Sequence, residues 1–273
     1  MMRLSCLSLS YQNQFRAGKM DLPAFIRTAR ALDLDGVDLH MQHLKSFDRI
    51  YLRQLRRLCL DNGMSIPSFP VSTEFGLYPD RINAEIEKCR VAMETGLFLG
   101  APLVRVFVGS TPPGGNPQDA FARGVDALRR CAEIGADIGM VVALQNHSGL
   151  TSTGDDMLRF HQAVNHPNFS LVLDTGHFTG RHGPNGPKQG RAHRRALLPQ
   201  PRPGRPPRPL RPRQALSGRR TGPRTVHRLP PRLRYPPRRP LQRLLSLVYE
   251  GAEDELAAIP RGARFLRRVM TAA

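Results

Sequence analysis

The sequence predicts an α/β protein in which parallel strands and helices form a (β/α)8 barrel. Short apolar runs alternate with amphipathic segments over residues 1–180, and the runs begin near residues 4, 36, 64, 102, 140 and 169. A strand and a helix repeating every thirty residues or so are typical of a parallel sheet. Eight such units would close a barrel in about 250 residues, and the chain has 273.

Each element has its own signal. The predicted strands are the apolar runs 4–10, 36–40, 64–69, 103–108, 140–144 and 169–173. Asp21 followed by Pro23 is a favoured helix start, and Asn62-Gly63 is a favoured stop. The predicted helices are the segment after Asp21, 47–61, 81–99, a segment around 121–132, and 155–164.

The regular pattern ends at residue 181. Residues 181–244 contain 18 Arg, one Lys, 15 Pro and no acidic residue. The rest of the chain holds 22 basic and 22 acidic residues, so the net charge of +19 lies in this one segment. Proline at this density is incompatible with helix interiors and central strands. Low apolar content together with charge of one sign predicts disorder.

Two interpretations of residues 181–244 remain open. The segment is about as long as a sixth helix, a seventh strand and a seventh helix. Shifted codons of a GC-rich gene encode Pro, Arg and Gly, so the composition indicates translation out of frame. Alternatively, the segment is a basic insertion that binds nucleic acid or another polyanion. Tyr235 is its only aromatic residue, which disfavours nucleic acid because bases stack on aromatic side chains.

Residues 245–273 resume the earlier pattern. They predict the last strand and helix of the barrel, with an apolar face that includes Leu256, Ile259 and Phe265 and an interruption at Pro260. The domain prediction is therefore six β/α units in 1–180, an out-of-frame or disordered segment in 181–244, and a final unit in 245–273. Without a seventh strand beside it, we expect 245–270 to dock weakly or not at all.

Composition also limits location and partners. The four cysteines, Cys6, Cys59, Cys89 and Cys131, form no CxxC pair, so neither a zinc knuckle nor a disulfide framework is indicated. The first ten residues lack the apolar stretch of a secretory signal, and no run approaches 18 apolar residues. We expect a cytoplasmic protein with reduced thiols and no membrane partner. The oligomeric state is left open.

Candidate site residues follow the apolar runs. In a barrel of this type the active site lies at the carboxyl ends of the strands. One polar residue there would ordinarily be a helix cap or a loop residue, but several at successive strand ends converge on one mouth. The residues at these positions are His40, Arg105, Gln145, Asn146, His147, Asp174, His177 and Glu250.

Four of these runs resemble motifs of one family, the xylose-isomerase-like TIM barrels, which include sugar phosphate isomerases and epimerases. The run 141–147 is similar to the A-L-E-N-H motif of strand five, and 171–177 to the D-T-G-H motif of strand six. The run 99–107 is similar to L-G-A-P-x-V-R of strand four, and 245–251 to the final S-x-E-Y-E-G. The resemblance covers about 1–180 and 245–270.

The resemblance implies a TIM barrel that uses a divalent metal, either Mn²⁺, Mg²⁺, Co²⁺ or Zn²⁺. Acting as a Lewis acid, the metal would stabilise an enediolate formed when a carboxylate removes a proton. The matching ligand positions here are Gln145, Asp174 and Glu250, with Glu250 and His177 as catalytic residues. Substrate contacts are predicted for His40, Arg105, Asn146 and His147.

Two departures from the motifs affect this prediction. Gln145 stands where the pattern has Glu, and a neutral amide can bind a hard cation but cannot act as a general base. A two-base epimerisation would therefore lose one base, whereas isomerisation, dehydration or a lyase reaction with Glu250 as base would remain. The metal-binding His of strand seven would fall within 181–244 and is not assigned. The sequence predicts a metal-dependent sugar, sugar-phosphate or sugar-acid isomerase or epimerase scaffold, whose activity as translated is left open.

Overall fold

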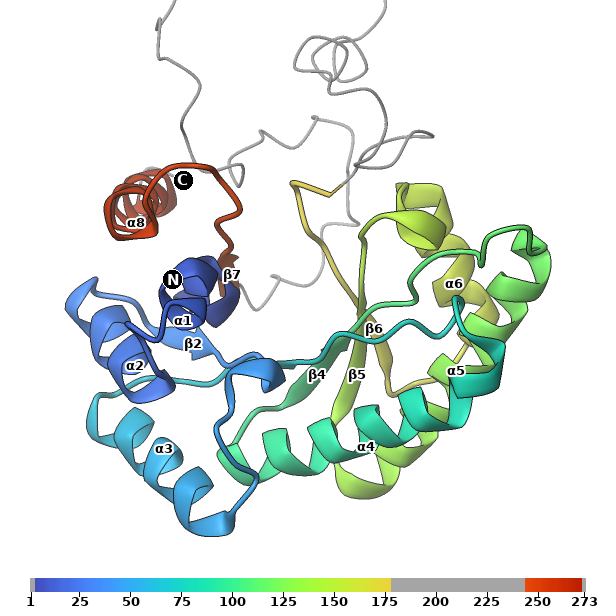
Figure 1. Ribbon diagram of the computed structural model, residues 1–273, viewed down its shortest axis with the longest axis horizontal. Helices are drawn as coiled ribbons and strands as arrows, with labels where there is room; N and C mark the ends of the chain where they lie inside the picture. Colours follow the sequence, from blue (N-terminus) through green and yellow to red (C-terminus); the bar gives the residue numbers. More distant parts are fainter. Residues whose placement is uncertain (1–2, 178–243, 272–273) are drawn as a thin grey trace, which may run out of the picture.

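The computed structural model describes residues 3–177 and 244–271 of the chain. In these residues parallel strands alternate with helices, and α2 to α6 pack around the outside of the strands (Figure 1). The predicted α/β architecture is confirmed. The interpretations of 181–244 as out of frame, disordered or polyanion-binding fall on residues that lie outside the described part, apart from residue 244.

Seven strands and their connecting helices make up the described residues. The strands are β1 (Arg3–Leu7), β2 (Gly36–Asp38), β3 (Phe69–Pro70), β4 (Leu103–Val106), β5 (Val141–Gln145), β6 (Phe169–Val172) and β7 (Leu244–Leu247). The helices are α1 (Gln12–Arg16), α2 (Leu22–Ala31), α3 (Arg49–Asp61), α4 (Ile82–Leu99), α5 (Pro117–Ile138), α6 (Gly154–Val164) and α8 (Glu255–Thr271). Short 3-10 helices are η1 (Ser8–Tyr11), η2 (Met41–His43), η3 (Pro79–Arg81) and η4 (Gly149–Thr151).

The strands form two parallel sheets, one in the order β2-β1-β7 and the other in the order β3-β4-β5-β6. One bridge between Gly36 and Ser65 connects them, so the strands follow the order of a barrel wall. Within the described residues no strand lies between β6 and β7. The connection requires glycine, because a Cβ atom at Gly36 would lie 2.5 Å from Ser65 Oγ.

Five of the six strands predicted in 1–180 are shorter in the structure, and the runs 4–10 and 64–69 show two reasons. The run 4–10 ends as a strand at Leu7, and Ser8 and Ser10 instead bond to the backbone of other segments. Ser8 Oγ accepts from the N–H of His40. Ser10 Oγ donates to the carbonyl of Leu247 and accepts from the N–H of Tyr249. In the run 64–69 only Phe69 pairs as a strand residue, together with Pro70. Prolines cannot donate to a ladder, and the run contains one at position 67.

The helix signals were more accurate. Asp21 caps α2 by accepting from the N–H of Ala24, as predicted. The predicted interruption at Pro260 was wrong, because α8 continues through it from Glu255 to Thr271. Proline removes only one N–H donor, and Ile259 and Leu266 stay buried on either side of it. Of the predicted apolar face, Leu256 and Phe265 are exposed and Ile259 is buried.

The expected weak docking of 245–270 was also wrong. Strand β7 pairs with β1 through four residue pairs, from Arg3–Leu244 to Cys6–Leu247. Leu247, Tyr249 and Ile259 are buried in the common core. Burying one aliphatic side chain of this size contributes about 1.5–3 kcal/mol, which offsets much of the cost of ordering the segment.

Helix α8 also contacts α1 through a buried carboxylate. Glu255 is 5% exposed, and it accepts from the backbone N–H groups of Asn13 at 2.9 Å and Gln14 at 3.2 Å. These are the free donors at the start of α1, where negative charge is favourable. The last helix therefore fixes the loop that follows β1, at the same end of the strands as the predicted site.

No helix among the described residues is both long and apolar enough to cross a membrane. All four cysteines are buried and carry free thiols.

Candidate active site

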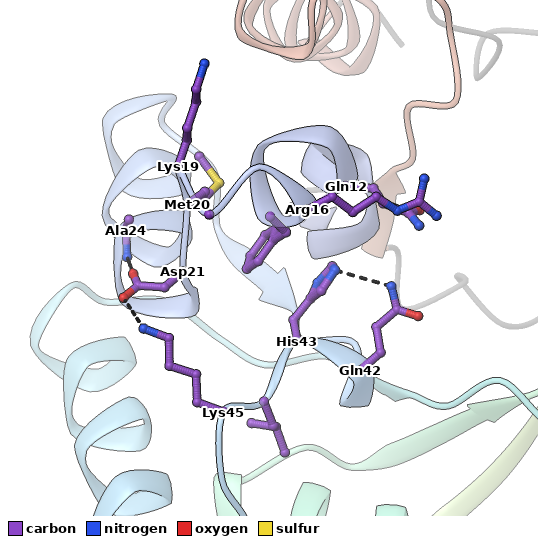
Figure 2. A pocket seen from close by; sticks show the side chains of 12 residues that line it. Gln12, Arg16, Lys19, Met20, Asp21, Ala24, Gln42, His43 and Lys45 are labelled. Carbon is purple, nitrogen blue, oxygen red and sulfur yellow. Dashed lines mark hydrogen bonds and ion pairs between the residues drawn. The ribbon is translucent and has the colours of Figure 1, made fainter.

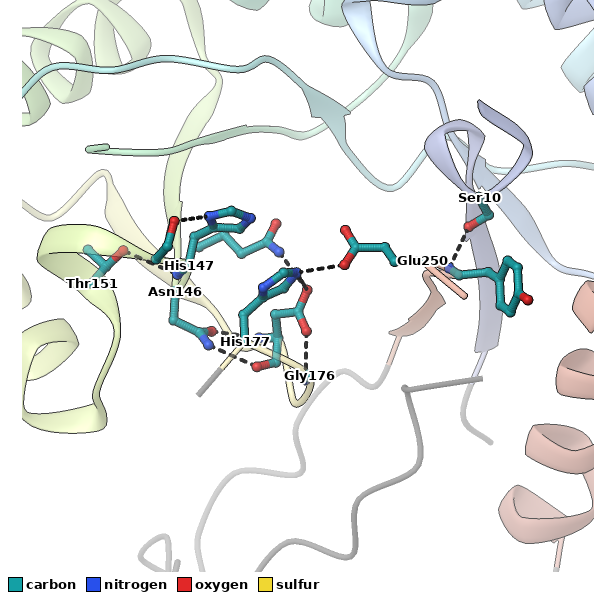
Figure 3. A network of polar contacts seen from close by, with 11 residues as sticks. Ser10, Asn146, His147, Thr151, Gly176, His177 and Glu250 are labelled. Atoms are coloured by element: carbon teal, nitrogen blue, oxygen red, sulfur yellow. Dashed lines mark hydrogen bonds and ion pairs between the residues drawn. The ribbon is translucent and has the colours of Figure 1, made fainter. Parts of the chain in front are cut away.

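The carboxyl ends of β5, β6 and β7 bring their polar side chains together (Figure 3). Gln145 ends β5 and is followed by Asn146 and His147, while Asp174 and His177 follow β6. Glu250 comes from the loop after β7, on the far side of the group. Because parallel strands end at one edge, sequence-distant residues meet here.

Asp174 is held on both carboxylate oxygens. Gln145 Nε2 donates to Oδ2 at 2.7 Å, and the N–H of Gly176 donates to Oδ1 at 2.8 Å. Its backbone is also fixed, because Asn146 Nδ2 donates to the Asp174 carbonyl and Asn146 Oδ1 accepts from the Asp174 N–H. The carboxylate therefore has a fixed orientation toward the centre of the site.

His177 lies between two carboxylates. Its Nε2 atom is 3.3 Å from Glu250 Oε2 and 3.8 Å from Asp174 Oδ2. The side chain of Asp174 is 8% exposed and that of Glu250 is 50% exposed, so the pair formed by His177 and Glu250 faces the open side. An imidazole and a carboxylate at this distance can exchange a proton between them and with a bound molecule.

His147 packs against His177 with ring centroids 4.3 Å apart, and its Nδ1 atom is 3.0 Å from Ser148 Oγ. Burial lowers the pKa of His147, and His177 and Arg105 lower it further, while Glu250 and Asp174 oppose this shift. The ring is therefore neutral near pH 7 and available as a hydrogen-bonding group.

Arg105 is a buried cation beside this group. It is 3% exposed on β4, and its guanidinium lies 4.2 Å from the centre of the Phe107 ring, which in turn contacts His147. Burial lowers its pKa to about 10, against the opposing effect of Asp38, Asp174 and Glu250, so it stays charged at neutral pH. Within the described residues its Nη1 atom has no hydrogen-bond partner, although such buried donors are ordinarily satisfied.

Sequence reasoning missed a second buried carboxylate, Asp38 at the end of β2. It is 3% exposed and accepts from the hydroxyls of Ser5 at 2.6 Å, Ser68 at 2.6 Å and Ser246 at 2.7 Å. Burial raises its pKa, while the three hydroxyl hydrogen bonds and Arg105 oppose that rise. The only sequence signal was a charged residue inside an apolar run.

His40, a predicted substrate contact, has its ring nitrogens occupied by other groups. Nδ1 accepts from the N–H of Gln42 at 3.2 Å, and Nε2 is 3.3 Å from Ser72 Oγ. Burial lowers its pKa to about 2, with added effects from Arg105 and His43, so the ring is neutral. Its contact with a substrate stays a prediction.

The other seven predicted site residues lie in one connected group. Hydrogen bonds, ion pairs and ring contacts join Gln145, Asn146, His147, Asp174, His177 and Glu250, and Phe107 links Arg105 to them. Their roles stay predictions, since proximity does not establish catalysis or binding.

The arrangement of donors does not fit a divalent cation. The described residues contain no group of three or more His, Cys, Asp or Glu side chains that could hold a metal. Gln145 presents an N–H to Asp174, not an oxygen to a cation. With the amide reversed, two oxygens would face each other at the same short distance and repel. The predicted metal and its ligands Gln145, Asp174 and Glu250 therefore stay a prediction that these contacts do not support.

A separate pocket of about 740 Å³ lies at the loops after β1 and β2 (Figure 2). His43 stacks on Phe15 there with ring centroids 3.9 Å apart, and Lys45 pairs with Asp21 at its edge. None of the eight predicted site residues lines this pocket, and sequence reasoning did not find it.

Comparison with known proteins shows which protein family the sequence matches. Residues 26–199 match the family described as xylose isomerase-like TIM barrel. Similar solved structures include D-psicose 3-epimerase from Clostridium cellulolyticum H10 with D-tagatose, at 15% identity and a TM-score of 0.56. Others are the probable 3-DHS dehydratase AsbF from Bacillus anthracis, at 23% and 0.55, and D-allulose 3-epimerase from Methylomonas sp., at 21% and 0.53.

Each of these likenesses covers 64% of this chain and 64% of the other, which is under two thirds of the relative's length. No curated protein matches the chain in sequence. At these identities the structural likeness establishes the fold, and it confirms the predicted TIM barrel.

Proposed function

Because the chain belongs to the xylose isomerase-like TIM barrel family, we propose that it is an isomerase or epimerase of a small sugar or sugar acid. The reaction moves a proton at the carbon next to a carbonyl, through an enediolate. The observation that carries this proposal is the contact of His177 Nε2 with Glu250 Oε2 at 3.3 Å, beside the buried cation of Arg105.

Glu250 is the base in this scheme. Its half-exposed carboxylate removes a proton from the carbon next to the carbonyl. The electron pair of that C–H bond forms the carbon–carbon double bond of the enediolate, and the π pair of the carbonyl moves to its oxygen. His177 gives a proton to the former carbonyl oxygen and takes one from the neighbouring hydroxyl. Its contact with Glu250 holds the two side chains close to each other. Glu250 then returns its proton to the neighbouring carbon, which completes an isomerisation with one base.

Arg105 supplies the positive charge that the enediolate needs. Its guanidinium is buried, charged at neutral pH, and has an Nη1 donor without a partner in the described residues. A charge held in a water-poor site stabilises a developing oxyanion more than one in water. The same donor suits a carboxylate or phosphate on the substrate, so anionic sugars are favoured over neutral ones.

Gln145 limits the reaction type. A neutral amide cannot remove a proton from the opposite face of the substrate, so a two-base epimerisation lacks its second base. One-base isomerisation is the reaction that the described residues support best, with dehydration by the same base as its variant. No step in this scheme uses a cation, because the donors among the described residues do not fit one.

A turnover assay of the full chain tests the proposal. Ketoses, ketose phosphates and sugar acids would be incubated with the wild type and with Glu250→Gln, and the products followed by ¹³C NMR. Removing a general base lowers kcat about 10²–10⁴-fold. Glu253→Gln is the matched control, because Glu253 lies in the same loop but pairs with Arg261. Equal turnover by the wild type and Glu250→Gln would contradict the assignment.

A further inference from the structure

Gln145 joins the ends of two neighbouring strands through its side chain. It is 8% exposed at the end of β5, and its amide donates at 2.7 Å to the carboxylate of Asp174, which follows β6. The family motif that this strand resembles has a carboxylate at this position. This chain therefore has a neutral donor where the motif would place a second negative charge.

We infer that the Gln145 amide substitutes for a divalent cation, so that this chain binds no such cation at Asp174 and a carboxylate at position 145 would create a cation site. Like a cation, the amide N–H stabilises the negative charge of Asp174, in this case through a hydrogen bond. The same bond links the end of β5 to the segment after β6. Cation occupancy is measured without turnover, so this inference can fail while proton transfer by Glu250 stands.

The contacts around Asp174 carry the inference. Each carboxylate oxygen already accepts one N–H, from Gly176 on Oδ1 and from Gln145 on Oδ2. A cation at Oδ2 would require the amide to turn, which breaks a partly buried hydrogen bond to a charged group. Losing such a bond lowers the affinity for a cation about 10–100-fold.

The charges around position 145 support the same inference. Asp174 and Glu250 supply two negative charges, and His177 already lies between them at 3.8 and 3.3 Å. A glutamate at position 145 would add a third charge and bring two carboxylates within hydrogen-bonding distance of each other. Without a cation these like charges repel, and with one they form the oxygen-rich set that Mn²⁺ and Mg²⁺ prefer.

Metal titration of the full chain tests the inference. Free Mn²⁺ would be followed by EPR, and the melting temperature measured in EDTA and in MnCl₂. The wild type should show no saturable Mn²⁺ site at Asp174 and no change in melting temperature. Gln145→Glu should melt below the wild type in EDTA, regain stability in MnCl₂, and bind Mn²⁺ at least about tenfold more tightly.

Two variants serve as controls. Gln118→Glu makes the same change at an exposed position of α5 and should leave the metal response as in the wild type. Adding Asp174→Asn to Gln145→Glu should remove the gained site.

Two outcomes would overturn the inference. One is a saturable Mn²⁺ site in the wild type that Asp174→Asn abolishes, and this titration decides the matter even if Gln145→Glu does not fold. The other is a folded Gln145→Glu variant that responds to Mn²⁺ no more than Gln118→Glu does.

Discussion

Two buried aspartates lie at strand ends in different sheets, and their surroundings differ. Within the described residues Asp38, the last residue of β2, accepts only from serine hydroxyls, and one of these, Ser246, belongs to β7. Asp174, after β6, accepts from an amide and a backbone N–H, and the imidazole of His177 lies 3.8 Å away. Each carboxylate receives several hydrogen bonds from neutral donors.

The two carboxylates differ in the other groups that surround them. The donors to Asp38 are neutral groups from three separate segments, so the carboxylate holds β1, β2 and β7 together. Asp174 is part of a group that includes His177 and the half-exposed Glu250, where a proton can move. Burial with hydrogen bonds makes a structural carboxylate, whereas chemistry needs a second titratable group open to a ligand.

The largest expected effect is on stability at Asp38. Asp38→Ala leaves three serine hydroxyls without their acceptor and removes the negative charge near Arg105, so unfolding free energy should fall by about 3–5 kcal/mol. Urea unfolding followed by circular dichroism measures this. Asp126→Ala, on the exposed face of α5, should change stability by no more than about 0.5 kcal/mol. A similarly small loss of unfolding free energy in Asp38→Ala would contradict a structural role for Asp38.

Substitution of Asp174 should lower turnover more than stability, whereas substitution of Asp38 should mainly lower stability. Asp174→Asn keeps an oxygen that can accept from Gln145 but weakens the orientation of His177, so kcat should fall about 10–100-fold. The melting temperature should fall much less than in Asp38→Ala. If Asp174→Asn instead unfolds the chain and leaves turnover intact, the two aspartates have the reverse roles.

The pH dependence of stability sharpens the contrast on the Asp38 side, where His40 is buried. Its pKa is lowered to about 2 in the folded chain, so below the unfolded value near 6.5 the unfolded state binds a proton that the folded state does not. Stability is therefore lost as pH falls from 6.5, by about 1.4 kcal/mol per pH unit from this residue. His40→Asn should have a shallower slope between pH 6.5 and 4.5 in urea unfolding. Parallel curves for the two proteins would contradict this.

The smallest effect concerns the contact of α8 with α1. Glu255→Gln removes the charge that accepts from Asn13 and Gln14, and the expected cost is about 1 kcal/mol. Thermal unfolding measures it, with Glu253→Gln, in the loop just before α8, as the control. A loss no greater than that of the control would show that the charge of Glu255 is unimportant for docking α8.

Much of the site could be predicted from the sequence because strand ends are local signals. An apolar run followed by polar residues identified Gln145, Asp174 and Glu250, and the fold brings such ends together. The sequence also separated residues 181–244 from the rest by composition alone.

What could not be predicted depends on contacts between distant segments. The serines around Asp38 come from positions 5, 68 and 246, and none has a local pattern that reports an acceptor. The docking of 245–270 depends on the ladder between β7 and β1, which no local signal encodes. The amide of Gln145 was expected to face a cation, whereas its N–H satisfies Asp174, because an amide can act as either donor or acceptor.

Exchange of substrate hydrogen with solvent tests the assignment of Glu250 most directly. The full chain would be incubated in D₂O with ketoses, ketose phosphates and sugar acids, and deuterium at the carbon next to the carbonyl measured by NMR. We predict incorporation into at least one anionic sugar by the wild type, and its loss in Glu250→Gln but not in Glu253→Gln. Equal incorporation by Glu250→Gln, or none from any compound by the folded wild type, would contradict proton transfer at this site.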